Sequence, residues 1–496
     1  MKRYIAALLL VMLSAGAASA QDELRLTLKE AVKLAVENNL DVKVELYNPA
    51  SSEADIRKAQ GIYNPVLSLL ADYKNSNIPS VNTVTTGGQS VNRQRSDALN
   101  AGATQLIPTG GTIGAAFNNS WNHSNFGLTN YFQSFVAFNL TQPLLKNFGR
   151  ETTEISINVA KFSREGALEQ FRSKLQEIVS QVKSQYNQLY SVRKNLEVKK
   201  TSLQLAETIL SNTQAQVKAG VLPAMETLNA QFGAATRQKE LIDAERALRD
   251  QIDIVRVLLQ LHNVTDIIPV DTPYKENYHV EEAEAVRYAL TERPDLKQQR
   301  VGLQTNELQL RVARHQTLPQ LDFTASAELH GISSSLYSDA KEVGLGQYPV
   351  WTAGLQLTYP LGNDSAENDY IKSKLKVEQT RTQIKSLEET ISRDVRTAIR
   401  AVDSGYKQLD VTARGRTYAE EVVQAFIKKQ KVGLATTKDV LDVMNNMVTA
   451  QGAEIQAVTD YNNAIVILWK TTGELLSREG ITLGEKEANS LYDANR

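Results

Sequence analysis

Apolar residues recur along the chain with two different periods, and the shorter period marks short strands. Alternation of apolar with polar or small residues is clearest at 136–141, 321–328 and 351–359. In the third segment the apolar set is Trp351, Ala353, Leu355, Leu357 and Tyr359. Strict alternation gives a strand one apolar and one polar face. Such strands fit a membrane barrel with lipid outside and water inside, and they fit a soluble β-sandwich equally well.

The longer period, three to four residues, predicts two very long helices. No proline occurs between 146 and 218 or between 361 and 431. The apolar seam of the second stretch consists of Ile384, Leu387, Ile391, Val395, Ala398 and Val402. This spacing is typical of coiled-coil packing. A helix over 361–431 would extend roughly 105 Å at about 1.5 Å per residue. It needs neighbours along its whole length, because one narrow apolar stripe cannot stabilise it alone.

Each long helix is predicted to end at a glycine and to be followed by a returning helix. The glycines are Gly220 and Gly433, and the returning helices are predicted over 224–261 and 437–475. Glycine just beyond a helix end readily adopts the left-handed conformation of a C-cap. The short connections therefore predict two antiparallel helical hairpins.

This order of elements occurs twice in the chain. The segment 30–43 returns as 284–297, an offset of 254 residues. In each copy a short amphipathic helix is followed by a second helix that is predicted to stop at a proline, Pro65 or Pro319, because proline disfavours helical geometry in its predecessor. We therefore predict a duplicated unit of strands and long helices.

The two copies differ by an insertion among the strands of the first copy. Its segments 97–107 and 111–121 flank the turn signal Pro108-Thr-Gly-Gly111, which predicts an added β-hairpin. The sequence leaves open whether this hairpin enlarges a barrel or lies outside it.

The predicted fold is mixed α and β, with a β-barrel continued by a long α-helical barrel. The predicted domains are a signal peptide at 1–20, a first repeat at 21–270, a second repeat at 271–476 and a flexible polar tail at 477–496. Within the repeats, strands are expected at about 65–142 and 320–360, followed by helical hairpins at 146–262 and 361–475.

The first twenty residues predict export. Lys2 and Arg3 precede a short apolar core, and Ala18-Ser-Ala20 is a small-residue cleavage site, as in secretory signal peptides. The chain has no cysteine, which excludes disulfides, thiolate metal sites and a lipid on an N-terminal cysteine. The net charge of −1 predicts no nucleic-acid partner. Five scattered histidines show no metal-ligand spacing, so we expect no cofactor and no enzyme activity.

Four strands, or six with the added hairpin, are fewer than the roughly eight that close a barrel. An open sheet cannot expose bare edges to lipid. Closure therefore requires several copies, and three copies would give twelve or eighteen strands.

Several ordered motifs together resemble TolC-type outer-membrane efflux and export channels over residues 26–476. These motifs are Leu26-Thr-Leu-Lys-Glu-Ala31, Leu140-Thr-Gln-Pro-Leu-Leu145, the two glycine turns and Asp439-Val-Leu-Asp442. The resemblance implies a homotrimer in outer-membrane lipid that reaches into the periplasm. It also implies docking to a periplasmic adaptor and an inner-membrane pump, in tripartite efflux or type I secretion. The sequence identifies neither cargo nor pump class. The alternative is a periplasm-spanning coiled coil or adhesin without a pore.

Asp439 and Asp442 are three residues apart, which places both carboxylates on one helix face. The resemblance implies that they form the constricted periplasmic gate, where like charges attract cations. A solvated helix N-terminus is the alternative interpretation. The corresponding residues of the first copy are Glu226 and Asn229, so the second copy alone supplies an acidic pair.

Some members of the family hold the closed tip with an arginine two residues after the glycine. Here that position is Ala435, so we expect a different latch. Lys438 is a candidate partner for Glu226, and we expect the tip to open more readily.

Two further groups of residues are candidate contact surfaces. The exposed turns are expected to dock the adaptor through Gly220, Val221, Leu222, Val432, Gly433 and Leu434, since exposed apolar groups mark interaction sites. An aromatic girdle at the membrane interface is expected from Trp121, Tyr131, Phe132, Tyr348 and Trp351. Capping contacts and core packing are the respective alternatives.

Overall fold

The computed structural model describes residues 23–79, 91–124, 130–262, 264–482 and 484–496. The predicted signal peptide at 1–20 lies outside these residues. The chain divides into two compact units, and both draw on both sequence repeats. The first unit comprises residues 1–49, 167–298 and 384–496, and the second comprises 50–166 and 299–383. The duplication is therefore an order of elements in the sequence and does not correspond to two compact domains.

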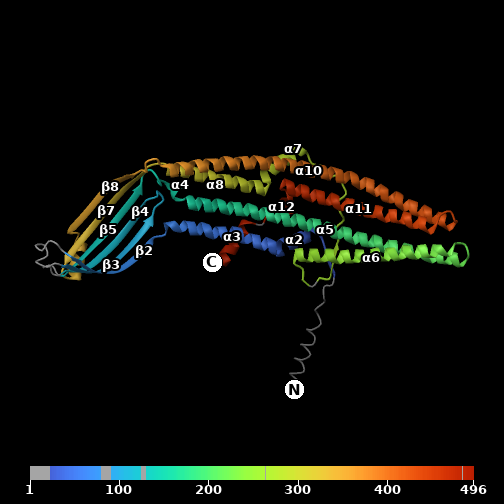
Figure 1. Cartoon of the computed structure of the whole chain (residues 1–496), viewed down its shortest axis with the longest axis horizontal. Helices are drawn as coiled ribbons and strands as arrows, with labels where there is room; N and C mark the ends of the chain where they lie inside the picture. Colours follow the sequence, from blue (N-terminus) through green and yellow to red (C-terminus); the bar gives the residue numbers. More distant parts are fainter. Residues whose placement is uncertain (1–22, 80–90, 125–129, 263, 483) are drawn as a thin grey trace, which may run out of the picture. The chain divides into compact units, whose positions relative to one another are not determined.

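The second unit contains a six-stranded antiparallel sheet in the order β2-β3-β4-β5-β7-β8 (Figure 1). Its strands are β2 (Val66–Pro79), β3 (Val91–Leu106), β4 (Thr112–Ser124), β5 (Tyr131–Pro143), β7 (Gln320–Ser333) and β8 (Tyr348–Thr358). The added hairpin is β3–β4. It lies inside the sheet, between β2 and β5, so it enlarges the sheet rather than lying outside it. Both of its strands are longer than the sequence predicted.

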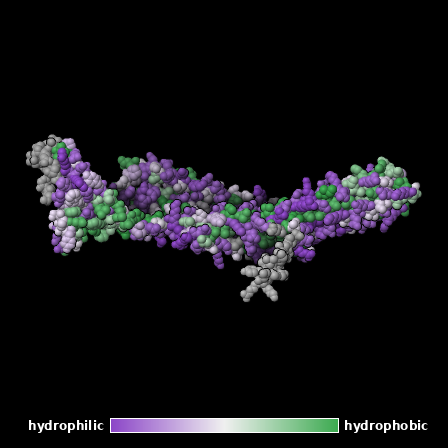
Figure 2. Space-filling model, turned by 90° about the horizontal axis from the view of Figure 1, so that it is seen from below, coloured by the Kyte–Doolittle hydropathy of each residue, from purple (hydrophilic) through white to green (hydrophobic). Residues whose placement is uncertain are grey.

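The register confirms the predicted alternation and places all the apolar sets on one side. One row across the six strands consists of Leu67, Ala103, Ala115, Phe138, Ala327 and Trp351. Two residues further along the strands, the next row is Leu69, Ala101, Phe117, Val136, Leu329 and Pro349. We call this side the apolar face. The opposite side, the polar face, includes Thr104, Asn139, Ser326 and Thr352. Figure 2 shows hydrophobic residues gathered over the strands.

The helices predicted in both repeats are present with shifted ends. The described helices are α2 (Leu28–Asn38), α3 (Leu40–Gln60), α4 (Arg150–Thr153), α5 (Ile155–Lys218), α6 (Ala224–Leu259), α7 (Glu282–Glu292), α8 (Pro294–Gln316), α9 (Leu336–Leu345), α10 (Asp364–Lys431), α11 (Thr437–Thr472), α12 (Leu475–Arg478) and α13 (Glu485–Ala494). Of these, α9, α12 and α13 are further helices that the sequence did not predict. A 3-10 turn (Gly61–Tyr63) follows α3, and β1 (Glu23–Leu26) pairs in parallel with β6 (Asp266–Pro269). The helix α10 begins later than predicted because Gly362 and Asn363 both have positive φ.

The core of the first unit contains an apolar seam of α5 with the expected spacing of three to four residues. Phe171, Leu175, Ile178, Val182 and Leu189 are buried in one cluster with side chains of α2, α6, β1 and β6. Tyr186 continues this seam, and its hydroxyl donates to the carbonyl oxygen of Leu26 at 2.9 Å. Burial raises the pKa of Tyr186 to about 12, so the phenol stays a neutral donor at physiological pH. The seam of α10 is buried in the same way against α11, through Ala398, Val402, Tyr461, Ile465 and Leu468.

The segment predicted to be a flexible tail, 477–496, contains helical residues that pack against the rest of the unit. This segment contains the end of α12 and the helix α13, in which Ala488 is fully buried. Ile481 packs against the cluster around α5, and Glu479 pairs with Lys183. The polar composition of the tail concealed these few contacts, each of which depends on residues far away in the sequence.

Replacing Phe171 with alanine tests this core. Phe171 is 1% exposed, and a Phe→Ala change at a buried site typically costs about 3–5 kcal/mol. We expect a clear fall in the thermal unfolding midpoint, followed by circular dichroism in detergent. Phe232→Ala is the matched control because Phe232 is 76% exposed, and we expect it to unfold like wild type. Equal midpoints for the two variants would contradict this assignment of the core.

Candidate functional site

The two glycine turns have the same backbone geometry. Gly220 and Gly433 have φ of +74° and +76°. In the first turn the Val221 amide donates to the Gln216 carbonyl at 2.9 Å, and in the second the Leu434 amide donates to the Lys429 carbonyl at 2.9 Å. These bonds close Schellman motifs at the ends of α5 and α10. A Cβ at either glycine would meet no atom within 4 Å, so the positive φ, rather than crowding, favours glycine.

The carboxylate of Asp439 caps the helix to which it belongs. It accepts hydrogen bonds from the Thr436 amide at 2.8 Å and the Thr436 hydroxyl at 2.7 Å, while the Asp439 amide donates to that hydroxyl at 3.2 Å. This is a reciprocal capping box at the start of α11. The bonds from Thr436 hold the pKa of Asp439 below its usual value. Asp442 is exposed one turn further along, so the two carboxylates occupy different environments.

Glu226 connects the two turns through the main chain. Its carboxylate accepts a hydrogen bond from the Thr437 amide at 2.9 Å, so the acidic residue of the first copy satisfies an amide at the start of α11. The Thr437 hydroxyl also accepts a hydrogen bond from the Gln430 side chain at 3.1 Å. Within the described part of this single chain, Glu226 forms no ion pair with Lys438, whose side chain is exposed. The expected pair between Glu226 and Lys438 therefore stays a prediction.

A buried polar network lies further along α6, and the sequence analysis missed it. Arg237 is 5% exposed and donates to Glu240 at 2.8 and 3.0 Å and to Asn445 at 3.0 Å. Lys199 donates to the same carboxylate at 3.0 Å. Burial opposes ionisation of Glu240, but these cationic donors outweigh it and hold its pKa below the usual range. The network ties α5, α6 and α11 together.

The helices α6 and α11 approach closely beside this network. A Cβ at Gly233 would lie 2.7 Å from the Leu441 side chain, so a larger residue would displace that side chain. A glycine inside a helix lowers its stability. The glycine at position 233, inside a predicted helix, was the one sequence feature that could have indicated this contact.

The turns expose an apolar surface that extends beyond the predicted residues. Val221, Val432 and Leu434 are between 68% and 77% exposed, and Leu222 is half-buried. The exposed surface continues along α6 through Met225, Leu228 and Phe232. Their spacing of three and four residues places them on one helix face. Exposed apolar surface of this kind is typical of an interaction site.

The register divides the five predicted girdle aromatics between the two faces of the sheet. Trp121 and Phe132 are paired on the apolar face, their ring centroids 6.5 Å apart, and Trp351 lies on the same face. Tyr131 and Tyr348 lie on the polar face. The girdle of all five residues stays a prediction, and Trp121, Phe132 and Trp351 are the three that share the apolar face.

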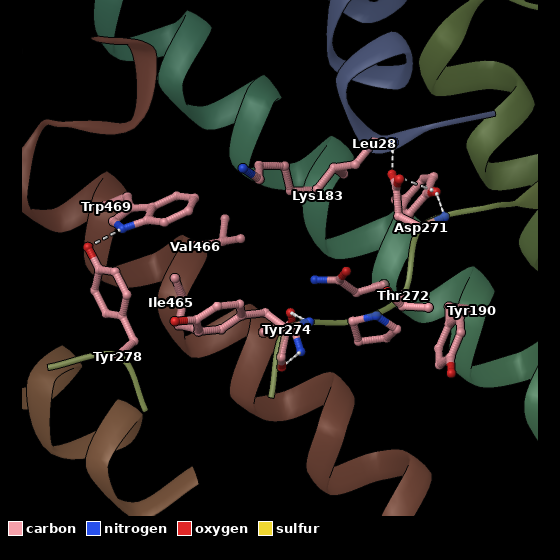
Figure 3. Close-up of a pocket in the computed structure, with 14 residues that line it drawn as sticks. Leu28, Lys183, Tyr190, Asp271, Thr272, Tyr274, Tyr278, Ile465, Val466 and Trp469 are labelled. Carbon is pink, nitrogen blue, oxygen red and sulfur yellow. Dashed lines mark hydrogen bonds between the residues drawn. The ribbon is translucent and has the colours of Figure 1, made fainter. Parts of the chain in front are cut away.

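A cavity of about 310 Å³ in the first unit is lined by aromatic side chains (Figure 3). The polar groups that line it are already paired within the protein. Asn462 bonds both main-chain polar groups of Tyr274 at 3.0 Å, the Trp469 indole donates to the Tyr278 hydroxyl at 2.8 Å, and Asp271 accepts from the Leu28 amide at 2.5 Å. We interpret this cavity as part of the packing that holds the segment around 271–278 against α5 and α11.

In the described ranges, no helix combines the length and apolarity needed to cross a membrane. Across the same residues, no group of three or more His, Asp or Glu side chains is arranged to hold a metal ion.

The long helical hairpins and the sheet with one apolar face define the class of outer-membrane channel proteins. The family model for outer membrane efflux proteins matches residues 31–258 and 285–474, and the chain belongs to this family. The match confirms the resemblance to TolC-type channels. The family is one of efflux channels and not of enzymes.

Individual relatives agree with this assignment. The chain is 21% identical over 367 residues to the outer membrane efflux protein BepC of Brucella suis, covering 72% of this chain and 76% of BepC. The fold is similar to that of the CmeC outer membrane channel of Campylobacter jejuni, with a TM-score of 0.66 and 16% identity over 95% of this chain and 89% of CmeC. It is also similar to VceC of Vibrio cholerae, with a TM-score of 0.65 and 14% identity over 90% of this chain and 96% of VceC.

Asp439 and Asp442 are expected to contribute differently to the stability of the start of α11. Asp439→Asn removes the charged acceptor of the capping box, so we expect several-fold faster amide hydrogen exchange around 436–444, measured by mass spectrometry at neutral pH. Asp442→Asn is the matched control and should exchange like wild type. Equal exchange in both variants would contradict the capping role.

The Asp439 cap also predicts a pH dependence. Because the pKa of Asp439 is lowered in the fold from its ordinary 3.8, its stabilisation is fully present above that value. It is lost as the pH falls through the lower folded pKa. We expect the protection of 436–444, corrected for intrinsic exchange, to fall over this acidic range in wild type and to change less in Asp439→Asn.

Proposed function

We propose that three copies of this chain form a channel-tunnel in the outer membrane that carries solutes out of the periplasm. The six-stranded sheet, with its two free edges and single apolar face, is the observation that carries this proposal. Among the described residues, β2 and β8 each pair on one side only. Unpaired strand edges are not tolerated in lipid, so β2 of one copy would pair with β8 of the next.

Three six-stranded sheets would give an eighteen-stranded barrel. Barrels of sixteen to eighteen strands leave a water-filled channel. The apolar face would then meet outer-membrane lipid, and the polar face, including Asn139, Thr141, Gln356 and Thr358, would line the water. The long hairpins would form the periplasmic helical barrel of the same trimer.

The exposed apolar turns support docking to a periplasmic adaptor protein, which would connect the channel to an inner-membrane pump. Gly220, Val221 and Leu222 of the first turn and Val432, Gly433 and Leu434 of the second would form this surface. The chain would then serve tripartite efflux or type I secretion, with small molecules or proteins as cargo. Delivery would begin with the signal peptide, without lipidation. A coiled coil or adhesin without a pore would not need a sheet with one apolar and one polar face.

We place the periplasmic gate at Asp439 and Asp442. In a trimer their carboxylates would form two rings in a constriction, which would attract cations and oppose anions. The capping bonds would fix the Asp439 ring in position, while the exposed Asp442 side chain remains mobile. Asp442 would therefore respond more to the passing ions.

Single-channel recording tests the pore and the gate together. We expect discrete cation-selective openings from the purified mature protein in planar bilayers, and weaker cation selectivity for Asp439→Asn/Asp442→Asn. Unchanged selectivity in the double variant would keep the pore and reject the acidic gate. A well-folded trimer without openings, even with its adaptor present, would contradict the channel.

The closed tip can be tested by comparing Glu226 and Lys438. If Glu226 acts by accepting the Thr437 amide, Glu226→Gln keeps an acceptor oxygen and should leak less than Glu226→Ala. Lys438→Ala should then leak like wild type. If Glu226 instead pairs with Lys438 across the trimer, Glu226→Gln and Lys438→Ala should leak equally and more than wild type. Closed-state conductance in planar bilayers separates the two cases.

A further inference from the structure

The helix α9 lies against the apolar face of the sheet, although it connects β7 to β8. A Cβ at Gly331 would lie 2.3 Å from the Asp339 carbonyl oxygen and 3.0 Å from the Val343 side chain. Gly331 is directly opposite Ser134 in the ladder of β5 and β7. Like Leu329, two residues earlier in the strand, it lies on the apolar face. Glycine is therefore required here to let the helix approach the strand.

The inward side of α9 buries Val343 and the polar Asp339, and Asp339 meets a polar patch on the sheet. Asp339 is fully buried, and its carboxylate accepts hydrogen bonds from the Ser134 hydroxyl and, at 3.2 Å, from the Ser134 amide. The Ser134 hydroxyl in turn accepts from the Asn119 side chain at 2.6 Å. Unpaired polar groups are costly in hydrocarbon. By accepting from Ser134, which is bonded to Asn119, the helix satisfies polar groups that lie next to the apolar rows.

The outward side of α9 is apolar, which reverses the usual pattern of a surface helix. Leu336, Tyr337 and Leu345 are 50%, 80% and 61% exposed, and Ala340 and Gly344 between them are exposed as well. A helix whose outer side met only water would not be expected to place polar groups inward and apolar groups outward.

When sheets of neighbouring copies pair edge to edge in a closed ring, they leave the outward side of α9 uncovered. The helix packs on β5 and β7, whereas neighbouring copies would pair with the edge strands β2 and β8. It follows the end of β7 at Ser333, and the long helices of the chain leave from the opposite end of the sheet, at Gln320 and Thr358. In an outer-membrane channel with periplasmic helices, α9 would therefore lie on the external half of the barrel.

We propose that α9 is a lipid-contact helix, with its outward side in the hydrocarbon of the outer leaflet. The occupant of this surface is the acyl chains of membrane lipid, because α9 continues the apolar face of the barrel without a break. Lys341, which is exposed on the same side, would extend its charged end to the headgroups. The inference rests on the proposed function, in which the apolar face of the sheet meets lipid.

The absence of cysteine from the chain allows a clean test with single-cysteine variants. Tyr337→Cys and Leu345→Cys report on α9. Leu355→Cys on the apolar face is the lipid control, and Thr352→Cys on the polar face of the same strand is the water control. Each variant of the full chain is labelled with a thiol-reactive fluorophore and reconstituted in phosphatidylcholine vesicles. Quenching by nitroxide-labelled lipid is then compared with quenching by aqueous iodide.

We expect labels at 337, 345 and 355 to be quenched several-fold more by nitroxide lipid, relative to iodide, than the label at 352. Iodide quenching at 337 and 345 with lipid quenching at 355 would overturn the lipid-contact helix and leave the channel intact. Shielding of 337 and 345 from both quenchers would show that protein covers the helix, and would overturn it too. Absence of lipid quenching at 355 would overturn the membrane barrel and the inference together.

Discussion

The main-chain groups at the two edges of the six-stranded sheet impose the strongest constraint on this molecule. Within the part of the chain that the structure describes, β2 and β8 each leave one side of a strand without partners, and lipid offers none. A soluble protein could leave such edges in water, but an apolar face as continuous as this one belongs in lipid. Pairing β2 with β8 of another copy resolves the conflict. The need for several copies thus follows from hydrogen bonding, before any contact between helices is considered.

The need to pair main-chain polar groups also explains the structure at the ends of the hairpins. A helix leaves four amides without partners at its start and four carbonyls at its end. At the turns, Schellman bonds satisfy carbonyls of α5 and α10, and Asp439 and Glu226 satisfy amides of α11. Glu226 belongs to the first repeat and Thr437 to the second. The first repeat therefore supplies a hydrogen-bond acceptor to the start of a helix in the second repeat. This unequal role accounts for the different acidic residues of the two turns.

The sequence predicted the features that follow from the local spacing of apolar residues. It did not predict the features that depend on contacts between residues far apart in the chain. Alternation located the strands, three-to-four spacing located the helices, and the turn signal after Pro108 located the added hairpin. Whether that hairpin joined the sheet depended on pairing with β2 and β5, which no local pattern specifies. The contacts of the tail at 477–496 were not predicted, because Ile481 and Ala488 are few apolar residues in a polar segment. The faces of the girdle aromatics were not predicted either, because one residue of register places Tyr131 and Tyr348 on the polar face.

The interval between β7 and β8 shows why local rules mislead at a membrane surface. Leu336, Tyr337 and Leu345 would be expected on a buried side of α9 if water were the solvent, yet they are exposed and the buried residues are Asp339 and Val343. Once lipid is the solvent on that face, the same sequence is consistent: polar groups pair inward and apolar groups face out. Ser134, which contradicts the alternation of its strand, binds Asp339 of the helix, and Asn119 donates to Ser134. The exceptions to the strand pattern therefore identify where α9 attaches.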